Sequence, residues 1–259
     1  MTAQSLPALF LSHGSPMLVF EDIPARRFIG GLGRTLERPN AILCISAHWE
    51  TERPTVSTAT APETIHDFYG FPDELYRLRY PAPGAPALAR RVVELLDEAG
   101  IGGATDPDHG LDHGAWNPLL LIYPQADVPV TQLSIQAHLD PAHHAQIGRA
   151  LQPLRREGVL VLASGGAVHN LRQFHVDRDR PAPWAVSFDD WLADRIAAGD
   201  EEALLAWRQQ RADGRMAHPS DEHLLPLFVA LGAGGGVAGR PLHRSFAHGS
   251  LSMAAFAWG

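Results

Sequence analysis

Three histidines end or follow apolar runs of the kind that fill buried strands. His13 follows LFLS, His48 ends ILCISAH, and His169 comes shortly after VLVLASGG. Histidine is the commonest metal ligand and the usual proton acceptor near neutral pH. In an open α/β sheet, ligands bind beyond the carboxyl ends of the strands, where the connecting loops converge. We therefore expect the three side chains to share one crevice, although long stretches of chain separate them.

The segment HPSDEHLLPLF supplies a fourth candidate, His223. Ser220 or Asp221 is predicted to cap a short helix that runs toward the glycine-rich GAGGG, which reads as the end of that helix and a loop. His223 would then lie in or just before the first turn, and Pro226 is tolerated only near such a start. A helix end that faces the crevice would add one more ligand.

The other histidines divide into pocket candidates and structural ones. His66 and His113 lie in long, turn-rich segments with aromatic residues beside them, which suits a substrate pocket or the surroundings of a metal. Solvent-exposed or structural roles are predicted for His138, His143, His144, His175, His243 and His248. The pattern favours neither role for His109 and His218.

Several common enzyme and targeting signatures are absent from the chain. It contains no HExxH, GxSxG, CxxC pair or Walker loop, and no GxGxxG after a strand. The lone Cys44 cannot form an internal disulfide and favours a reducing compartment. No run is long enough to span a bilayer, and the start lacks a basic signal-peptide region. A soluble, cytoplasmic protein is expected.

The charge balance indicates the kind of partner. The chain has 21 basic and 29 acidic side chains and a formal net charge of -8 at pH 7. This charge argues against a nucleic acid, and it gives no reason to expect an anionic membrane. The expected partner is a small molecule, and the expected assembly is a monomer or a small homo-oligomer.

Short apolar runs alternate with segments of helical periodicity, and this alternation predicts the fold class. Strands are predicted at 7–12, 40–46, 128–135 and 158–165, helices at 86–100, 141–158 and 188–210, and long loops at 61–86 and 105–119. The alternation predicts a single α/β domain over residues 1–259. Its central, mostly parallel or mixed sheet is expected to be sandwiched between helical layers.

A set of segments spread along the chain carries a family resemblance. In order, they are LFLSHGSPM, ISAHWET, IHDFYGFP, LYRLRYPAPG, LDHGAWNPL, VPVTQLSI, ASGGAVHNLR, HPSDEHLLPLFVALGA and GSLSM. Together they resemble the 4,5-DOPA extradiol dioxygenase family, within the class III ring-opening dioxygenases that are similar to the protocatechuate 4,5-dioxygenase B subunit. The resemblance extends from about residue 7 to residue 254.

The resemblance implies a metal site and a proton-transfer group. His13, His48 and His223 would bind a divalent metal, and His169 would act beside it as acid and base or as a possible fourth ligand. His113 is the second candidate for acid and base. More distant relatives use two histidines and a glutamate, and this sequence has His223 where that glutamate is expected. Fe(II) is expected for activity, while Zn(II) also suits a set made of imidazoles.

The reaction that the resemblance implies is extradiol opening of a DOPA-like catechol by O2 to a semialdehyde. A metal-bound catechol hydroxyl would lose its proton to a neighbouring histidine. The candidates for stacking on the substrate or pairing with its carboxylate are His66, Phe68, Tyr69, Phe71, Trp116, Arg77, Arg79 and Arg172. Two alternatives stay open: a zinc-dependent hydrolase or amidohydrolase at the same histidines, and a non-catalytic binding protein of the same fold.

Overall fold

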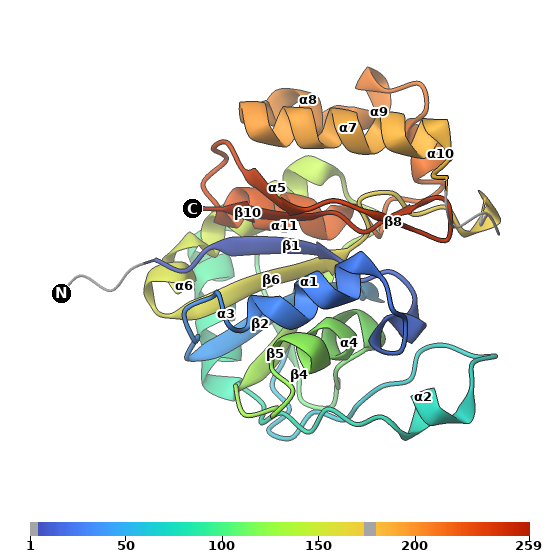
Figure 1. Ribbon diagram of the computed structural model, residues 1–259. Coiled ribbons are helices and arrows are strands. Elements are labelled where there is room, and N and C mark those ends of the chain that lie inside the picture. The colour runs from blue at the N-terminus through green and yellow to red at the C-terminus, as the bar shows by residue number, and fades with distance from the viewer. Residues whose placement is uncertain (1–4, 174–179) are drawn as a thin grey trace.

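Four parallel strands form the middle of the central sheet. They are β1 (Ala8–Ser12), β2 (Ala41–Glu50), β5 (Val130–Ile135) and β6 (Val159–Gly165), and they stand side by side in the order β5-β2-β6-β1. The computed structural model that shows them describes residues 5–173 and 180–259 (Figure 1). The four predicted strands are confirmed.

Further strands complete both edges and make the sheet mixed. On one side, β10 (Ala255–Trp258) pairs antiparallel with β1, and β7 (Arg240–His243) pairs antiparallel with β10. On the other side, β3 (Thr55–Ser57) is antiparallel to β5, and β4 (Ala104–Asp106) is parallel to β3. The sheet therefore has eight strands among the described residues.

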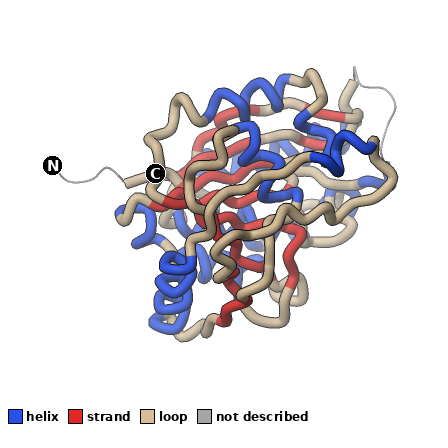
Figure 2. Tube along the Cα trace, turned by 90° about the horizontal axis from the view of Figure 1, so that it is seen from below, coloured by secondary structure: helices blue, strands red, loops and turns tan. Residues whose placement is uncertain are grey.

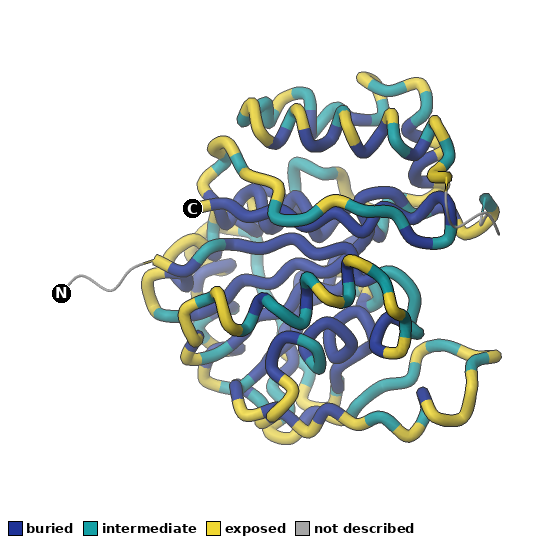
Figure 3. The backbone as a smooth tube through the Cα atoms, viewed as in Figure 1, coloured by how far each residue is buried: buried dark blue, intermediate teal, exposed yellow. Residues whose placement is uncertain are grey.

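The side chains of the central strands alternate between two cores, one on each face of the sheet. In β1, Leu9 and Leu11 enter one core, whereas Ala8 and Phe10 enter the other. Because such a strand is buried on both faces, its sequence reads as a continuous apolar run. Figure 3 shows the resulting band of buried backbone through the middle of the molecule.

Helices close both cores, so the predicted sandwich of helical layers is confirmed. One core is covered by α1 (Pro24–Leu32) and α4 (His113–Ile122), which lie in front of the strands in Figure 1. The other is covered by α3 (Pro86–Glu98), α5 (Pro141–Ala150) and α11 (Leu225–Ala233). Figure 2 shows the strands passing between these helices.

The other elements are short, apart from one long helix. They are η1 (Pro16–Val19), α2 (Asp73–Arg77), α6 (Gln152–Arg156), η2 (Leu171–Gln173), α7 (Pro183–Ala198), α8 (Glu201–Leu205), α9 (Trp207–Gln210), α10 (Gly214–Ala217), β8 (Phe246–Ala247) and β9 (Leu251–Ser252). In the part of the chain that the structure describes, no helix combines the length and the apolar character needed to cross a membrane.

Two segments predicted as continuous helices are interrupted. The segment 188–210 contains the end of α7 followed by α8 and α9, because Gly199 adopts a left-handed conformation (φ 66°) that ends α7. The side chain of Asp200 then caps α8. The segment 141–158 is likewise divided at Leu151 into α5 and α6. Helical periodicity continues across both breaks, so the sequence pattern conceals them.

Part of the second predicted loop is helical, which corrects that prediction. α4 begins at His113, and the side chain of Asp112 caps it by accepting a hydrogen bond from a backbone N–H of the first turn. Pro118 lies inside the helix and has no N–H to donate to the carbonyl of Gly114. The hydroxyl of Ser164, at the end of β6, donates to that carbonyl instead. Tertiary contact thus replaces the hydrogen bond that the proline removes.

The close approach of α5 and α11 requires glycine. A Cβ added to Gly232 would lie 2.1 Å from the carbonyl oxygen of Ala145, which is rigid helix backbone. We expect Gly232→Ala to lower the free energy of unfolding by about 1–3 kcal/mol, because the two helices must move apart. Chemical denaturation measures this loss.

Gly30→Ala in α1 is the matched control, because a Cβ there meets its nearest atom only at 3.9 Å. This variant should keep the free energy of unfolding or raise it by up to about 1 kcal/mol, since alanine favours the helix. Equal destabilisation by the two variants would contradict the packing explanation.

Candidate active site

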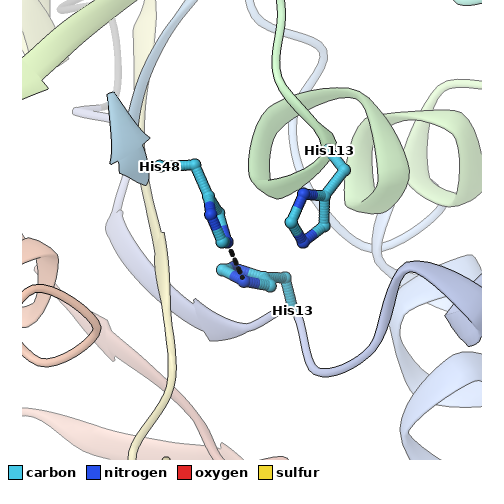
Figure 4. Close-up of side chains that lie close together, drawn as sticks. All are labelled: His13, His48 and His113. Carbon is cyan, nitrogen blue, oxygen red and sulfur yellow. Dashed lines mark hydrogen bonds between the residues drawn. The ribbon is translucent and has the colours of Figure 1, made fainter. Parts of the chain in front are cut away.

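The carboxyl ends of the central strands bring the predicted histidines together. His13 follows β1, His48 lies near the end of β2, and His113 is the first residue of α4, and Figure 4 shows their rings converging. The ring centre of His13 lies 4.9 Å from that of His48 and 5.3 Å from that of His113. The centres of His48 and His113 are 4.0 Å apart. Histidines from distant parts of the chain therefore form one cluster.

His223 and His169 extend this cluster. The ring centre of His223 lies 5.5 Å from that of His13 and 5.0 Å from that of His48. His169 stacks flat on His223, with ring centres 3.5 Å apart and planes within 7° of parallel. All five histidines line one cavity of about 560 Å³.

The position of His223 agrees with the prediction, but the predicted cap does not form. His223 lies in the turn immediately before α11, and no side chain caps this helix. Ser220 donates to Glu222 instead. The carboxylate of Asp221 pairs with the guanidinium of Arg208, which draws it away from the helix end.

A chain of hydrogen bonds fixes the tautomer of His13. Its Nδ1 lies 3.0 Å from the hydroxyl oxygen of Ser164. Because that hydroxyl gives its proton to the carbonyl of Gly114, it can only accept from His13, so Nδ1 carries the hydrogen. The Nε2 of His13 is then left with its lone pair facing the cluster. An imidazole that binds a metal through one ring nitrogen is usually oriented by a hydrogen bond from its other ring nitrogen.

Carboxylates fix the tautomers of two further histidine rings. The Nδ1 of His113 donates to Asp67 over 2.9 Å, and the Nδ1 of His223 donates to Glu222 over 3.0 Å. The Nε2 of His223 is buried and has no hydrogen-bond partner among the described residues. This nitrogen is therefore available to bind an ion.

The inward nitrogens have the spacing of metal ligands. The Nε2 atoms of His13 and His48 are 3.0 Å apart and share a hydrogen bond, the dashed line in Figure 4. Two nitrogens that each bind an ion at about 2.1 Å, at roughly a right angle, are separated by about that distance. One ligand nitrogen from each of His13, His48 and His113 lies within 4.8 Å of the others, and a second such group combines His223 with His169 and Glu222. The residues present fit a divalent metal.

The electrostatics of the cluster keep four of its histidines neutral, namely His13, His48, His169 and His223. Burial, together with the neighbouring rings, holds the pKa values of His13 and His223 well below the ordinary value. Burial and the ring of His113 lower the pKa of His48 to about 3, and burial lowers the pKa of His169 to about 4. Neutral imidazole is the form that binds a metal or accepts a proton.

Asp67 is the residue of this site that sequence reasoning missed. Its two oxygens accept hydrogen bonds from the backbone N–H and the Nδ1 of His113, each over 2.9 Å, and Oδ2 lies 3.6 Å from the Nδ1 of His48. Burial alone would raise the pKa of Asp67, but the contacts with His113 outweigh it and the pKa falls to about 2. The available signal was the carboxylate in the aromatic-rich stretch HDFYGF, beside the more conspicuous His66.

The predicted aromatic substrate-binding residues divide between the cavity wall and a layer behind it. Phe68 and Tyr69 line the cavity, as does Phe71. His66 and Trp116 are not among the lining residues. The ring of His66 bonds a backbone carbonyl, and Trp116 is fully buried with its indole N–H on another carbonyl. These two rings pack against each other and against Phe68 from behind.

The predicted arginines lie outside the cavity lining. Arg172 follows Leu171, which does line the cavity, within η2. Arg79 donates to two backbone carbonyls, and Arg77 lies 3.9 Å from the carboxylate of Asp73.

The remaining described histidines are not among the cavity residues either: His109, His138, His143, His144, His218, His243 and His248. Of the two that the sequence left undecided, His109 stacks on Trp49, and the buried ring of His218 bonds the carbonyl of Ala167. Both therefore have structural contacts. His175 lies outside the described residues.

Comparison with protein families identifies the fold and its chemistry. Residues 7–257 match the family described as the catalytic LigB subunit of aromatic ring-opening dioxygenase. The chain belongs to the LigB family. Its match covers nearly the whole chain, as the resemblance of the short segments predicts.

Individual LigB relatives agree over similar lengths. The chain is 44% identical to a 4,5-DOPA dioxygenase extradiol of Beta vulgaris, over 95% of this chain and 94% of that protein. It is 46% identical to a protein of the same name from Escherichia coli K12, over 90% of this chain and 87% of that one. The crystal structure of an uncharacterized Escherichia coli K12 protein superposes with a TM-score of 0.83 at 38% identity, covering 98% of this chain and all of that one.

Membership of the LigB family confirms the predicted class of enzyme. The protein is an aromatic ring-opening dioxygenase, an oxidoreductase that acts on a small molecule with O2. The hydrolase and the non-catalytic binding protein are not favoured. The family implies a non-haem metal, and the histidine cluster provides a site that could hold one.

Loss of the Ser164 hydroxyl should weaken metal binding. In Ser164→Ala the Nδ1 of His13 loses its acceptor, so the ring is free to rotate or to change tautomer. We expect the affinity for Co(II) or Zn(II) to fall about 10–100-fold, as measured by competition with a chelator.

Ser57→Ala is the matched control, because Ser57 is also buried and its hydroxyl also donates to a loop carbonyl, that of His109. It should cost similar stability and leave the metal affinity unchanged. Equal affinities in the two variants would contradict the orienting role of Ser164.

Proposed function

We propose that this protein is an extradiol dioxygenase that opens a catechol ring with O2 to give a semialdehyde. The names of its relatives make a DOPA-like catechol the first substrate to test. The observation that carries the proposal is the cavity of five histidines, in which Asp67 holds the Nδ1–H of His113. Such a site combines neutral nitrogen ligands with a group that can exchange a proton.

The proposed metal ligands are His13, His48 and His223, with His169 as a possible fourth. Their inward nitrogens and their low pKa values support this assignment. Fe(II) is the proposed active metal, and Zn(II) is an alternative occupant of such an imidazole set. When bound, the metal supplies a meeting point for the catechol and O2 and lowers the pKa of the catechol hydroxyl.

His113 and His169 are the proposed proton-transfer groups, and the contacts favour His113. The ionised Asp67 holds its Nδ1–H, so that a proton taken up at Nε2 gives an imidazolium beside a carboxylate. Among the described residues no carboxylate hydrogen-bonds the ring of His169, which stacks on His223 instead. We therefore place His113 before His169 as the acid and base, the reverse of the order expected in the sequence analysis.

The aromatic wall orients the substrate and excludes water. Phe68 stands edge-on to His113, with ring centres 5.7 Å apart, and Phe71 packs edge-on against Phe68. A catechol whose hydroxyls face the histidines would place its ring against this wall, where offset and edge-to-face contacts between rings are favourable.

We also propose a single domain in a cytoplasmic protein that is a monomer or a small homo-oligomer. The eight-stranded sheet that runs through the described residues supports the single domain. The buried, unpaired Cys44 is compatible with a reducing compartment.

Anaerobic loading with Fe(II), followed by L-DOPA and air, tests the proposed reaction. We expect one O2 consumed for each yellow ring-opened product, measured with an oxygen electrode and by visible absorbance. His13→Ala should lose both signals, whereas His243→Ala, which removes a histidine away from the cavity, should keep them. Iron-loaded protein that consumes no O2 with DOPA or any simple catechol would refute the proposal.

Two substitutions separate the proton-transfer histidines. His113→Gln should lower kcat about 10²–10⁴-fold, the usual range for a lost acid or base, and should retain bound iron. His169→Gln should slow turnover less and leave some metal bound. Steady-state kinetics with metal analysis measures both, and a larger loss of kcat in His169→Gln would reverse the assignment.

Asp67→Asn should act through His113. The amide keeps the size of the side chain but removes the negative charge, so we expect kcat to fall about 10–100-fold while KM and iron content change little. A variant with normal kcat would show that Asp67 serves only to hold its loop.

A further inference from the structure

Two chemically different groups of side chains line the cavity. One group consists of the five histidines and Asp67. The other is mainly apolar and aromatic and consists of Pro16, Phe68, Tyr69, Phe71, Leu171 and Leu251. Ser15 also lines the cavity, and its hydroxyl accepts from the backbone N–H of Met17 while its own proton stays available. A catechol with its hydroxyls toward the histidines must therefore direct its substituent toward an apolar surface.

Positive charge is scarce around this surface. The chain contains no lysine at all, so arginine is its only side chain with a permanent positive charge. None of the arginines in the described residues lines the cavity. Arg79 is held by backbone carbonyls behind the loop, and Arg77 lies near Asp73. The charged side chain that does line the cavity is the carboxylate of Asp67, so the described lining supplies no cationic side chain to pair with a substrate carboxylate.

The rim of the cavity is apolar and exposed to solvent. Tyr69 is 92% exposed and Leu171 is 60% exposed, and both line the cavity. They come from segments about a hundred residues apart in the chain, so the rim is apolar on more than one segment. A substituent that reaches the rim would remove apolar surface from water on the protein and on itself, which is favourable in proportion to the area covered.

We propose that the preferred substrate is a catechol with an uncharged, apolar substituent, such as a short alkyl chain para to one hydroxyl, rather than one with a carboxylate. This inference rests on the proposed ring-opening function and names the substrate class of the same site. The substituent lies against Leu171, Leu251 and Phe71. L-DOPA is then accepted for its catechol ring, but its zwitterionic side chain finds no matching cation in the described wall.

A substrate series tests the preference on the iron-loaded enzyme. The substrates are catechol, 4-methylcatechol, 4-ethylcatechol and 4-propylcatechol, with 3-(3,4-dihydroxyphenyl)propionate and L-DOPA as carboxylates. Each added carbon should raise kcat/KM about three- to fourfold, the equivalent of about 0.8 kcal/mol per buried methylene. The propionate should fall at least tenfold below 4-propylcatechol. Equal or higher kcat/KM for the propionate or for L-DOPA would overturn the inference.

Failure of the inference can be told apart from failure of the proposed function. If none of the six compounds is ring-opened, the proposed function itself is wrong. If all are opened but the carboxylates are preferred, the function stands and only the substrate class is wrong.

A charge introduced at the rim gives a second test. Leu171→Arg should raise the ratio of kcat/KM for the propionate to that for 4-propylcatechol at least tenfold, because it supplies the missing cation. Val237→Arg is the control: Val237 is 55% exposed and does not line the cavity, so the ratio should stay at its wild-type value. An unchanged ratio in Leu171→Arg would show that the substituent does not approach this wall.

Arg172→Gln tests the alternative explanation that Arg172, in η2, binds the carboxylate of the substrate. A loss of kcat/KM confined to the propionate and L-DOPA would assign that role to Arg172 and overturn the proposal. The same change for all six substrates agrees with an apolar wall that carries the selectivity.

Discussion

The hydroxyl of Ser164 lies where three elements of the fold depend on one another. It donates to the carbonyl that Pro118 leaves without a partner in α4, and it accepts from the Nδ1 of His13 at the end of β1. A proline inside a helix usually costs stability because one hydrogen bond is lost. Here the vacated carbonyl fixes the direction of a hydroxyl proton, and the hydroxyl in turn fixes the tautomer of a histidine. The backbone hydrogen bond that α4 lacks is therefore part of what orients the site.

Hydrogen bonds to Nδ1 also explain how the three imidazoles of His13, His113 and His223 can be buried together. Burial alone disfavours their charged forms and leaves unsatisfied nitrogens, which is costly unless each ring has a partner. Asp67 and Glu222 lie on the Nδ1 side of His113 and His223, so that the Nε2 sides can face inward as neutral lone pairs. Negative charge on the Nδ1 side of the rings and neutral nitrogens on the Nε2 side together favour a cation at the centre of the cluster.

Much of this arrangement could be predicted from the sequence, because its cause is local. Strands buried on both faces give clear apolar runs, and a histidine at the carboxyl end of such a strand lies where the loops beyond the sheet converge. The turn that holds His223 was also predictable from Pro226, which must stand near a helix start. The family resemblance then joined residues that periodicity alone could not connect.

What the sequence could not show depends on contacts between distant segments. The sequence around Pro118 does not indicate that Ser164 will donate to the carbonyl of Gly114, which the proline leaves without a donor. The segment of α4 was therefore predicted as a loop. Asp67 looks like any loop carboxylate until His113 is placed beside it.

The aromatic residues show the same limit, because type alone does not separate a ring that faces the cavity from one that supports it. Phe68 lines the cavity, whereas Trp116, equally suited to stacking, is fully buried behind it. Trp116 packs in the core and has its indole N–H on a backbone carbonyl, which satisfies that donor in the buried position. The rings and aliphatic side chains that reach the surface of the cavity form a mainly apolar wall, and no arginine of the described residues belongs to it.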